Sequence, residues 1–338
     1  MKNNLNTPYI SKKFYTATSE YCNYKHHVPA PYIRKTFYLD KISENTILTI
    51  CGLGFYKLYI NGLDITRGAL APYISNPNQL MLYDTYNISK HLTIGKNCIG
   101  IMLGNGMQNS MGGSVWDFHK ADFRSAPKFA LAFEVDGKLI FEADSTFKVK
   151  SSPITYDDLR AGEHYDARLE EPHWNSPSYD DSGWSNAILA VTPKGEPMIS
   201  TADPITCYKE LSPVKIIKTK RGYIYDFGQN LAGVCRLKIQ GEKGQEIIMT
   251  HGEVVLKNKL YMRNISFFLR TKKNYWQQNR YTLKGNGIEE YTPRFTYQGF
   301  RYVLISGLII FFQALNVLEN FGMLFYNPNL LTIQYVPP

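Results

Sequence analysis

The densest group of side chains that could do acid–base chemistry runs from Asp157 to Glu171. Hydrolysis of a glycosidic bond needs two carboxyl groups facing each other across a sugar, roughly 5–10 Å apart. Asp158, Glu163 and Asp166 could supply such a pair. Two arginines are interleaved among them, however, and a carboxylate paired with arginine has a lowered pKa that does not suit a general acid. We therefore favour a structural ion-pair network, with a free-standing hydrolase as the alternative.

A second group of polar and aromatic side chains lies in the glycine-rich segment 104–124. Amides and carboxylates can hydrogen-bond the vicinal hydroxyls of a sugar, and an indole face can cover its apolar edge. The glycines let the loop bend closely around a ligand. The alternative is that the tryptophan fills the end of a β-sandwich and the amides cap turns. The candidate residues are Asn105, Gln108, Asn109, Trp116, Asp117 and Arg124.

Patterns typical of other catalytic or metal sites do not occur in the sequence. The seven histidines include no HExxH motif, and the adjacent His26 and His27 would point to opposite faces of a strand. The segment Gly104–Gly106 lacks the spacing of a phosphate-binding loop, and there is no GxSxG motif. Whether a metal is bound stays unknown at this level.

The net charge of +9 raises the question of a nucleic-acid partner. A dense cluster, Arg270–Lys273, holds only three charges, and no nucleic-acid-binding motif accompanies it. We therefore expect a solvated basic surface and no nucleic-acid partner. The longest apolar stretch, Leu308–Leu318, is too short to cross a bilayer, so we expect no membrane partner either.

The five cysteines are scattered and odd in number, which is typical of small core residues in a reducing compartment. The segment Met1–Ser11 has no apolar region of the signal-peptide kind. We therefore expect a cytoplasmic protein.

Alternation of apolar and polar residues dominates the chain. Phe129, Leu131 and Phe133 form one face of a candidate strand, and Asn-Gly or Asp-Gly pairs such as Asn61-Gly62 and Asp136-Gly137 predict tight hairpin turns. Many short strands between such turns predict an all-β fold of two β-sandwich domains in tandem. Four prolines between Pro193 and Pro213 indicate the boundary between the domains.

Several motifs resemble the bacterial α-L-rhamnosidases of glycoside hydrolase family 78. Their order along residues 33–307 is that of the family's amino-terminal β-domains. They include LYING (58–62), YDTYNI (83–88), GEHYDARLE (162–170), YDDSGW (179–184), YDFGQNLAG (225–233), HGE (251–253) and PRFTYQGFRYV (293–303). The resemblance implies an N-terminal extension at 1–29, a jelly-roll or galactose-binding-like domain at 30–200, and a concanavalin-like sandwich at 205–307.

The family's acid and base lie in an (α/α)6 barrel that follows the β-domains, and no position of this sequence matches them. The resemblance therefore implies a non-catalytic carbohydrate-recognition or scaffold portion, without turnover of its own. The whole enzyme would hydrolyse terminal α-L-rhamnosyl bonds, and a separately encoded barrel would be its partner. An inert fragment of a disrupted gene is the remaining alternative.

The resemblance also implies the ligand. Jelly rolls of this type can bind L-rhamnose or a rhamnose-containing glycan, in some members with calcium, and no other cofactor is expected. The family often carries a Gly-Asp-Gly-Trp-like turn where this chain has Gly104-Asn105-Gly106-Met107, so contacts made by those family side chains do not carry over.

Residues 308–338 form a divergent tail, because all 38 Lys and Arg residues of the chain precede it. A shift of reading frame explains the loss of charge, the end of the resemblance and the apolar stretch, whereas a short docking helix explains only the last. We expect a poorly packed tail.

Overall fold

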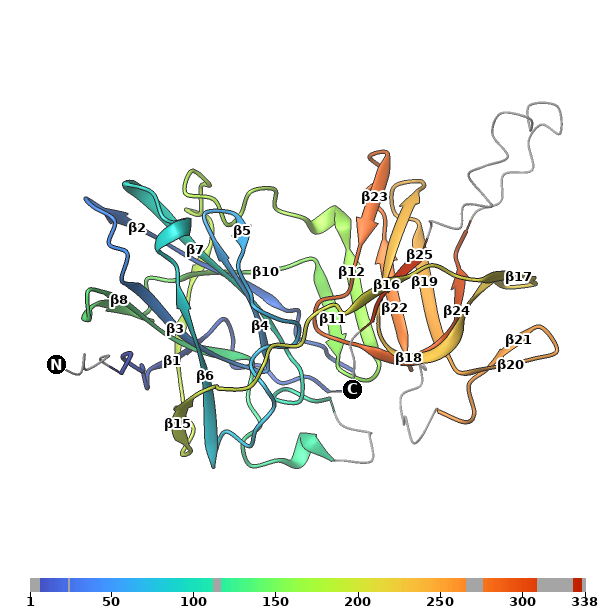
Figure 1. Ribbon diagram of the computed structural model, residues 1–338, viewed down its shortest axis with the longest axis horizontal. Coiled ribbons are helices and arrows are strands. Elements are labelled where there is room, and N and C mark those ends of the chain that lie inside the picture. The colour runs from blue at the N-terminus through green and yellow to red at the C-terminus, as the bar shows by residue number, and fades with distance from the viewer. Residues whose placement is uncertain (1–6, 24, 112–116, 266–275, 309–330, 336–338) are drawn as a thin grey trace. The chain divides into compact units, whose positions relative to one another are not determined.

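The structure is a computed structural model that describes residues 7–23, 25–111, 117–265, 276–308 and 331–335. Nearly all of its elements are strands (Figure 1). The helical elements of the described residues are three short 3-10 turns, η1 (Ser89–His91), η2 (Phe118–Lys120) and η3 (Ala167–Leu169). The all-β prediction is therefore confirmed. No helix within these residues is long and apolar enough to span a bilayer.

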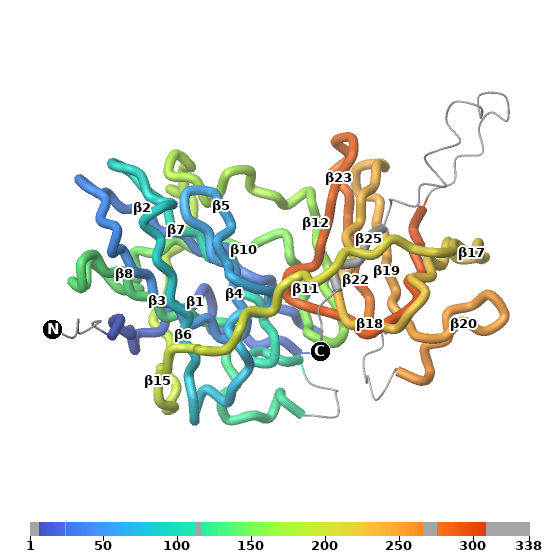
Figure 2. Tube along the Cα trace, in the orientation of Figure 1, coloured from blue at the N-terminus to red at the C-terminus, as the bar shows by residue number. Residues whose placement is uncertain are grey.

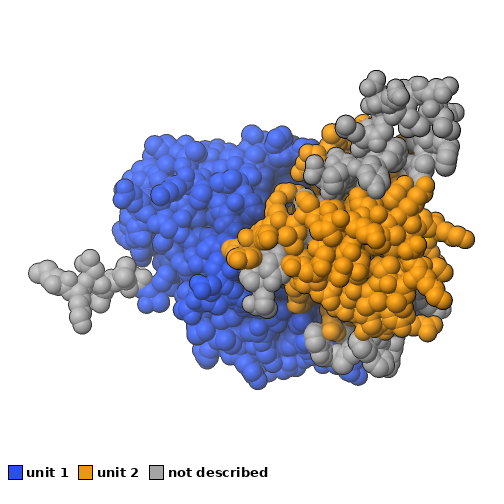
Figure 3. All heavy atoms as spheres, turned by 45° about the vertical axis from the view of Figure 1, so that its right-hand side comes forward, with its two compact units in different colours: residues 1–158, 170–205 blue, residues 159–169, 206–338 orange. Residues whose placement is uncertain are grey.

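The chain forms two compact units, which Figure 3 distinguishes by colour. The first contains residues 1–158 and 170–205, and the second contains residues 159–169 and 206–338. The change of unit near residue 205 falls in the proline-rich segment that the sequence singled out. Residues 159–169, which the sequence analysis assigns to the first domain, belong to the second unit.

The first unit contains two β-sheets. One has the strand order β14 (Ile188–Ala190), β1 (Phe14–Thr16), β8 (Lys128–Val135), β3 (Thr46–Leu53), β6 (Leu80–Asn87) and β15 (Glu196–Ile199), with β9 (Lys138–Glu142) also paired to β8. The other has the order β13 (Ser185–Asn186), β10 (Lys148–Ser151), β2 (Pro31–Leu39), β7 (Gly95–Gly104), β4 (Phe55–Ile60) and β5 (Leu63–Asp64). Strand β11 (Ile154–Asp158) follows them.

The core of the first unit consists of apolar side chains from both sheets, as a sandwich requires. Its buried members include Leu48, Ile50, Leu131 and Phe133 from the first sheet, and Ile33, Leu58, Ile99 and Ile101 from the second. Strand β8 is buried on its other face as well, where Ala130 packs in a smaller cluster with Phe14 and Tyr83. The alternation in β8 therefore separates large from small buried residues.

The second unit is built on one large sheet. Its strand order is β12 (Gly162–Asp166), β22 (Gln278–Thr282), β19 (Glu246–Gly252), β24 (Gln298–Ser306), β18 (Gly222–Gln240), β25 (Leu331–Tyr335) and β16 (Lys209–Leu211). Strands β17 (Lys215–Thr219) and β23 (Ile288–Tyr291) also pair with β18, and β20 (Val254–Leu256) forms a hairpin with β21 (Lys259–Tyr261). In β18, Cys235, Leu237 and Ile239 are buried while Lys238 and Gln240 are exposed, as their alternation predicts.

Two of the predicted hairpin turns have the backbone conformation that their residues favour. Asn61 and Gly62 have positive φ angles of 50° and 91°, and Asp136 and Gly137 have 53° and 74°. Positive φ at both central residues is characteristic of a type I′ turn, which matches the twist of the strands it joins. These turns connect β4 to β5 and β8 to β9.

Part of the predicted tail belongs to the sheet of the second unit. Strand β25 pairs antiparallel with Gly233–Leu237 of β18 and with β16. Residues 309–330 and 336–338 lie outside the described residues. The proposed divergence of residues 308–338 stays a prediction.

Candidate functional site

The carboxylates between Asp157 and Glu171 are distributed over the two units. Asp157 and Asp158 end strand β11 in the first unit, while Glu163 and Asp166 lie on β12 in the second. Asp166 forms an ion pair of 2.6 Å with Arg168, and this hydrogen-bonded partner lowers the pKa of Asp166. Such a carboxylate is a poor proton donor at neutral pH.

Glu163 is fully buried and its side chain serves as an internal hydrogen-bond acceptor. Its Oε2 accepts the backbone N–H groups of Arg294 at 2.9 Å and Phe295 at 3.0 Å, and its Oε1 accepts the Tyr291 hydroxyl at 3.1 Å. Burial raises the pKa of Glu163. A raised pKa is useful in a general acid, but this carboxyl has no exposed surface through which to meet a substrate. The arrangement supports a structural role.

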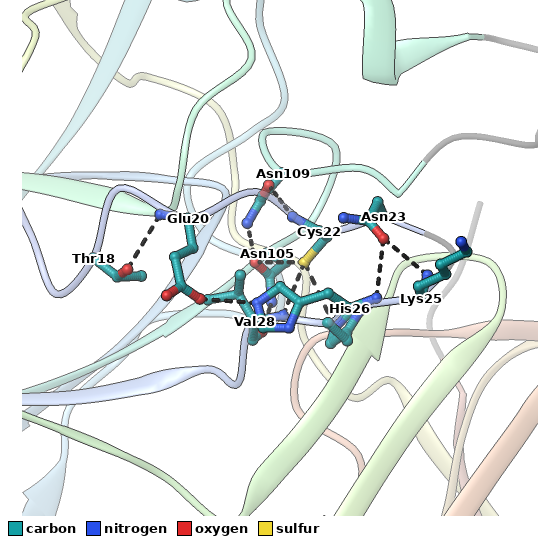
Figure 4. Close-up of polar contacts among 10 residues, drawn as sticks. Thr18, Glu20, Cys22, Asn23, Lys25, His26, Val28, Asn105 and Asn109 are labelled. Carbon is teal, nitrogen blue, oxygen red and sulfur yellow. Dashed lines mark hydrogen bonds and ion pairs between the residues drawn. The ribbon is translucent and has the colours of Figure 1, made fainter.

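Asn105 and Asn109 connect their loop to the N-terminal segment around Cys22 and Val28 (Figure 4), and Asn105 also connects it to Asp157. Asn105 donates from its backbone N–H to Asp157 Oδ2 at 2.6 Å and from Nδ2 to Asp157 Oδ1 and to the Val28 carbonyl, both at 2.8 Å. Asn109 donates from Nδ2 to Asn105 Oδ1 at 2.8 Å, and its own Oδ1 accepts the backbone N–H of Cys22 at 3.0 Å. Both amides are buried, so their polar groups are occupied by the protein itself.

The same place brings a thiol, an imidazole and an amide together. The Cys22 Sγ lies 4.0 Å from His27 Nε2 and donates to Asn105 Oδ1 at 3.5 Å. Burial raises the pKa of Cys22 to about 12 and lowers that of His27 to about 4. A cysteine nucleophile needs the opposite, a thiolate stabilised by a protonated imidazole. The cluster is therefore part of the fold and not a nucleophilic centre.

The other predicted sugar ligands are placed differently from one another. Arg124 donates to the carbonyls of Cys22 and of His119, the latter at 3.1 Å, and so fastens the loop to the N-terminal segment. Asp117 is exposed and pairs with Lys120 at 3.0 Å. Trp116 lies outside the described residues. The prediction that these residues contact a sugar stays a prediction.

Gln108 lines a hollow of about 240 Å³ in the first unit. Its Nε2 donates to the Phe123 carbonyl at 2.6 Å and to Ser125 Oγ at 2.9 Å, which fixes the amide at the wall. The other lining residues come from three segments that are distant in sequence: Leu53 and Gly54, then Pro72, Tyr73, Ile74, Ser75, Asn76 and Leu82, then Met107, Phe118 and Phe123.

The hollow has the composition expected of a small sugar site. Tyr73, Phe118 and Phe123 contribute aromatic rings to its lining, and Gln108 and Asn76 contribute amides, although the Nε2 of Gln108 already donates to Phe123 and Ser125. Of this set, only Gln108 could be named from the sequence. The available signal for Tyr73 was that it is an aromatic residue directly after Leu70-Ala71-Pro72, a segment that also resembles the family's amino-terminal module.

A bound metal finds little support among the described residues. No three His, Cys, Asp or Glu side chains of this part of the chain gather in a metal-binding arrangement. The expectation that calcium takes part in sugar binding stays a prediction.

Comparison with known proteins decides the family. A model of the α-L-rhamnosidase N-terminal domain matches residues 41–209, and a model of the bacterial α-L-rhamnosidase concanavalin-like domain matches residues 217–320. The chain belongs to the bacterial α-L-rhamnosidase family. The second match extends into the predicted tail as far as residue 320.

Curated α-L-rhamnosidases are similar to this chain over much of its length. One from Formosa agariphila is 32% identical over 291 residues, which are 82% of this chain and 30% of that protein. One from Streptomyces avermitilis is 32% identical over 267 residues, which are 75% of this chain and 24% of that protein. The chain therefore spans less than a third of the length of these rhamnosidases.

Solved rhamnosidase structures share its fold. The enzyme from Dictyoglumus thermophilum matches with a TM-score of 0.79 and 33% identity, over 96% of this chain and 35% of that one. The Streptomyces avermitilis enzyme, solved in complex with L-rhamnose, matches with a TM-score of 0.78 and 27% identity, over 91% and 28% of the two chains. The tandem β-domains of this rhamnosidase-family chain are thus an arrangement found in whole enzymes of the family.

Proposed function

We propose that this chain is a non-catalytic, carbohydrate-recognising and scaffolding portion of an α-L-rhamnosidase. The observation that carries the proposal is the 240 Å³ hollow with its aromatic walls and fixed amide. L-rhamnose is a 6-deoxy sugar, so one edge carries a methyl group and the rest carries hydroxyls. Rings can cover the methyl edge while amides bond the hydroxyls. We infer that a terminal L-rhamnosyl residue is the ligand of the hollow.

The parent reaction, hydrolysis of terminal α-L-rhamnosyl bonds, is part of the same proposal. Each described carboxylate whose contacts are given above is engaged with backbone donors or basic side chains, which supports a chain without turnover. Catalysis would then need a separate barrel as partner. Assay of the chain with a chromogenic α-L-rhamnoside should show no hydrolysis above the buffer rate.

Calorimetric titration with L-rhamnose tests the site. We expect the wild-type chain to bind with a dissociation constant of about 1 mM or tighter. Phe118→Ala removes one wall of the hollow and should abolish measurable binding, because the lost ring is a large part of the apolar surface that covers the sugar. Titrations with and without calcium show whether the ion contributes.

The matched control is Tyr38→Ala, which removes an aromatic ring that is 74% exposed and does not line the hollow. It should bind as the wild type does. Circular dichroism must show that both variants keep the fold. If the wild type shows no binding at L-rhamnose concentrations up to tens of millimolar, with or without calcium, the proposal of sugar recognition is contradicted. An inert or purely structural fragment would then be the better interpretation.

A further inference from the structure

Two β-hairpins of the second unit project from its large sheet (Figures 1 and 2). Residues of both hairpins line a hollow of about 700 Å³. One hairpin joins β17 to the start of β18, and the other joins β20 to β21. The described lining residues of the hollow all belong to this unit, and its volume is about three times that of the hollow beside Gln108. Its volume lies within the usual range of ligand sites.

The backbone fixes the position of both hairpin tips. In the first, the Thr219 hydroxyl donates to the Gly222 carbonyl at 2.9 Å and accepts the backbone N–H of Arg221 at 3.1 Å. Gly222 has a φ of 138°, and a Cβ there would lie 1.9 Å from the Ile305 carbonyl oxygen, so only glycine lets this hairpin lie against β24. In the second, Lys257 and Asn258 have φ angles of 49° and 58°, as in a type I′ turn.

In the part of the chain that the structure describes, the rim of the hollow carries positive charge and no acidic residue. Its charged lining residues are Lys218, Lys220, Arg221, Lys257 and Lys259, and all five are exposed. Ion pairs found among the described residues include none of them. The floor is apolar, formed by Ile224, Leu260 and Leu304.

Nearby carboxylates are engaged elsewhere and do not neutralise the rim. Asp226 accepts two hydrogen bonds from Arg301, at 2.8 and 3.0 Å. Glu253, which precedes β20, accepts from Asn264 at 3.2 Å. Like charges gathered around one concave surface repel each other and raise the local concentration of anions. No described contact within the protein offsets the repulsion among these five cations, whereas an anionic ligand would offset it.

We propose that this two-hairpin hollow binds an acidic polysaccharide through its carboxylates. Several cations around one extended hollow match a polymer with repeated negative charge better than a single small anion. Among the described residues no aromatic side chain lines the hollow. Single-stranded nucleic acid is usually held by stacking on such rings, so nucleic acid is the weaker match. The inference that the polymer is a polysaccharide rests on the proposed function. The inference that it is acidic rests only on the cations that line the hollow.

Binding of the full chain to immobilised polygalacturonate, a linear uronic-acid polymer, tests this proposal. Biolayer interferometry should show binding that weakens strongly as sodium chloride is raised from about 50 to about 300 mM, because these charges are exposed and easily screened. Neutral amylose should not bind. The triple variant Lys220→Gln, Lys257→Gln and Lys259→Gln should weaken the binding at least about tenfold at low salt.

The matched control changes the net charge equally but away from the hollow. Lys41→Gln, Lys138→Gln and Lys243→Gln alter three exposed lysines that do not line it, and should weaken binding less than about twofold. Equal effects of the two triple variants would overturn the proposal in favour of net charge alone. Equal or tighter binding of a poly(dT) oligonucleotide at the same salt concentration would overturn it in favour of nucleic acid.

The two binding sites can fail independently. Phe118→Ala should lose L-rhamnose but keep polygalacturonate, and the two-hairpin variant should do the reverse. Loss of rhamnose binding alone would leave the acidic-polysaccharide site standing. Absence of polygalacturonate binding by the wild type would remove that site and leave the proposed function untouched.

Discussion

Replacement of Glu163 by alanine should strongly destabilise the second unit. The buried carboxylate accepts two backbone N–H groups, from Arg294 and Phe295, and the hydroxyl of Tyr291. Each buried donor left without a partner costs about 1–3 kcal/mol. Removing a buried, desolvated carboxyl returns part of that cost. The expected net loss is about 4 kcal/mol, which is a large fraction of the stability of an ordinary domain.

Urea unfolding followed by circular dichroism measures this loss, with two matched variants. Glu163→Gln keeps a carbonyl oxygen that can accept both backbone bonds, so it should lose no more than about 1 kcal/mol. Asp166→Asn lies on the same strand but breaks only an ion pair with a half-exposed arginine, and should also lose about 1 kcal/mol or less. A Glu163→Ala chain as stable as the wild type would refute the reasoning. Rhamnoside hydrolysis by the wild type that Glu163→Gln abolishes, with stability unchanged, would instead show a catalytic role.

Three further predictions concern stability. Asp181→Ala leaves the guanidinium of Arg34, which is fully buried, without its carboxylate, and should cost about 3 kcal/mol in thermal unfolding. His27 and His251 have pKa values lowered by burial from 6.5 to about 4. On acidification the unfolded chain takes up a proton at each histidine at a higher pH than the folded chain does. The free energy of unfolding should therefore be constant above about pH 6.5 and fall towards pH 4 by about 3 kcal/mol per histidine. His→Gln variants should show a smaller fall over this range. Deletion of 309–338 removes β25 from between β16 and β18 and should lower the melting temperature or promote aggregation; an unchanged melting temperature would support a frameshifted tail.

The sequence was sufficient for the fold class because the relevant signals are local. The alternation around Cys235 and the positive-φ turn at Asn61-Gly62 depend on neighbouring residues only, and the structure contains both. The assignment of residues 159–169 to the second unit could not be found in this way. Strand β12 pairs in parallel with β22, more than a hundred residues later, and no local pattern encodes that partner.

Residue type alone could not show which of the candidate sugar-binding residues are free to contact a ligand. Residue type reports that Asn105 and Asn109 can bond a hydroxyl, but not that Asp157, Val28 and Cys22 already use those groups. Only the three-dimensional structure shows which polar atoms are satisfied within the protein.

The charged surface could not be predicted from any single run of basic residues. Lys220 and Lys257 lie on separate hairpins, and each hairpin by itself holds only a few basic residues, Lys218, Lys220 and Arg221 on one and Lys257 and Lys259 on the other. Their juxtaposition depends on the close approach of Gly222 to β24. A patch built from two hairpins cannot be recognised from either one alone.

The motif GEHYDARLE shows what kind of structural information the family resemblance contains. Gly162 has a φ of 125°, and a Cβ there would lie 2.0 Å from the Gln278 carbonyl oxygen. Glu163 bonds the backbone near residue 294, and Tyr165 stacks on Tyr281 at 5.8 Å. Each of these residues holds β12 in its sheet, so the motif identifies the family through packing and not through catalysis. The contacts of this motif therefore account for the packing of β12 and do not bear on the two proposed ligand sites, whose lining residues lie outside residues 162–170.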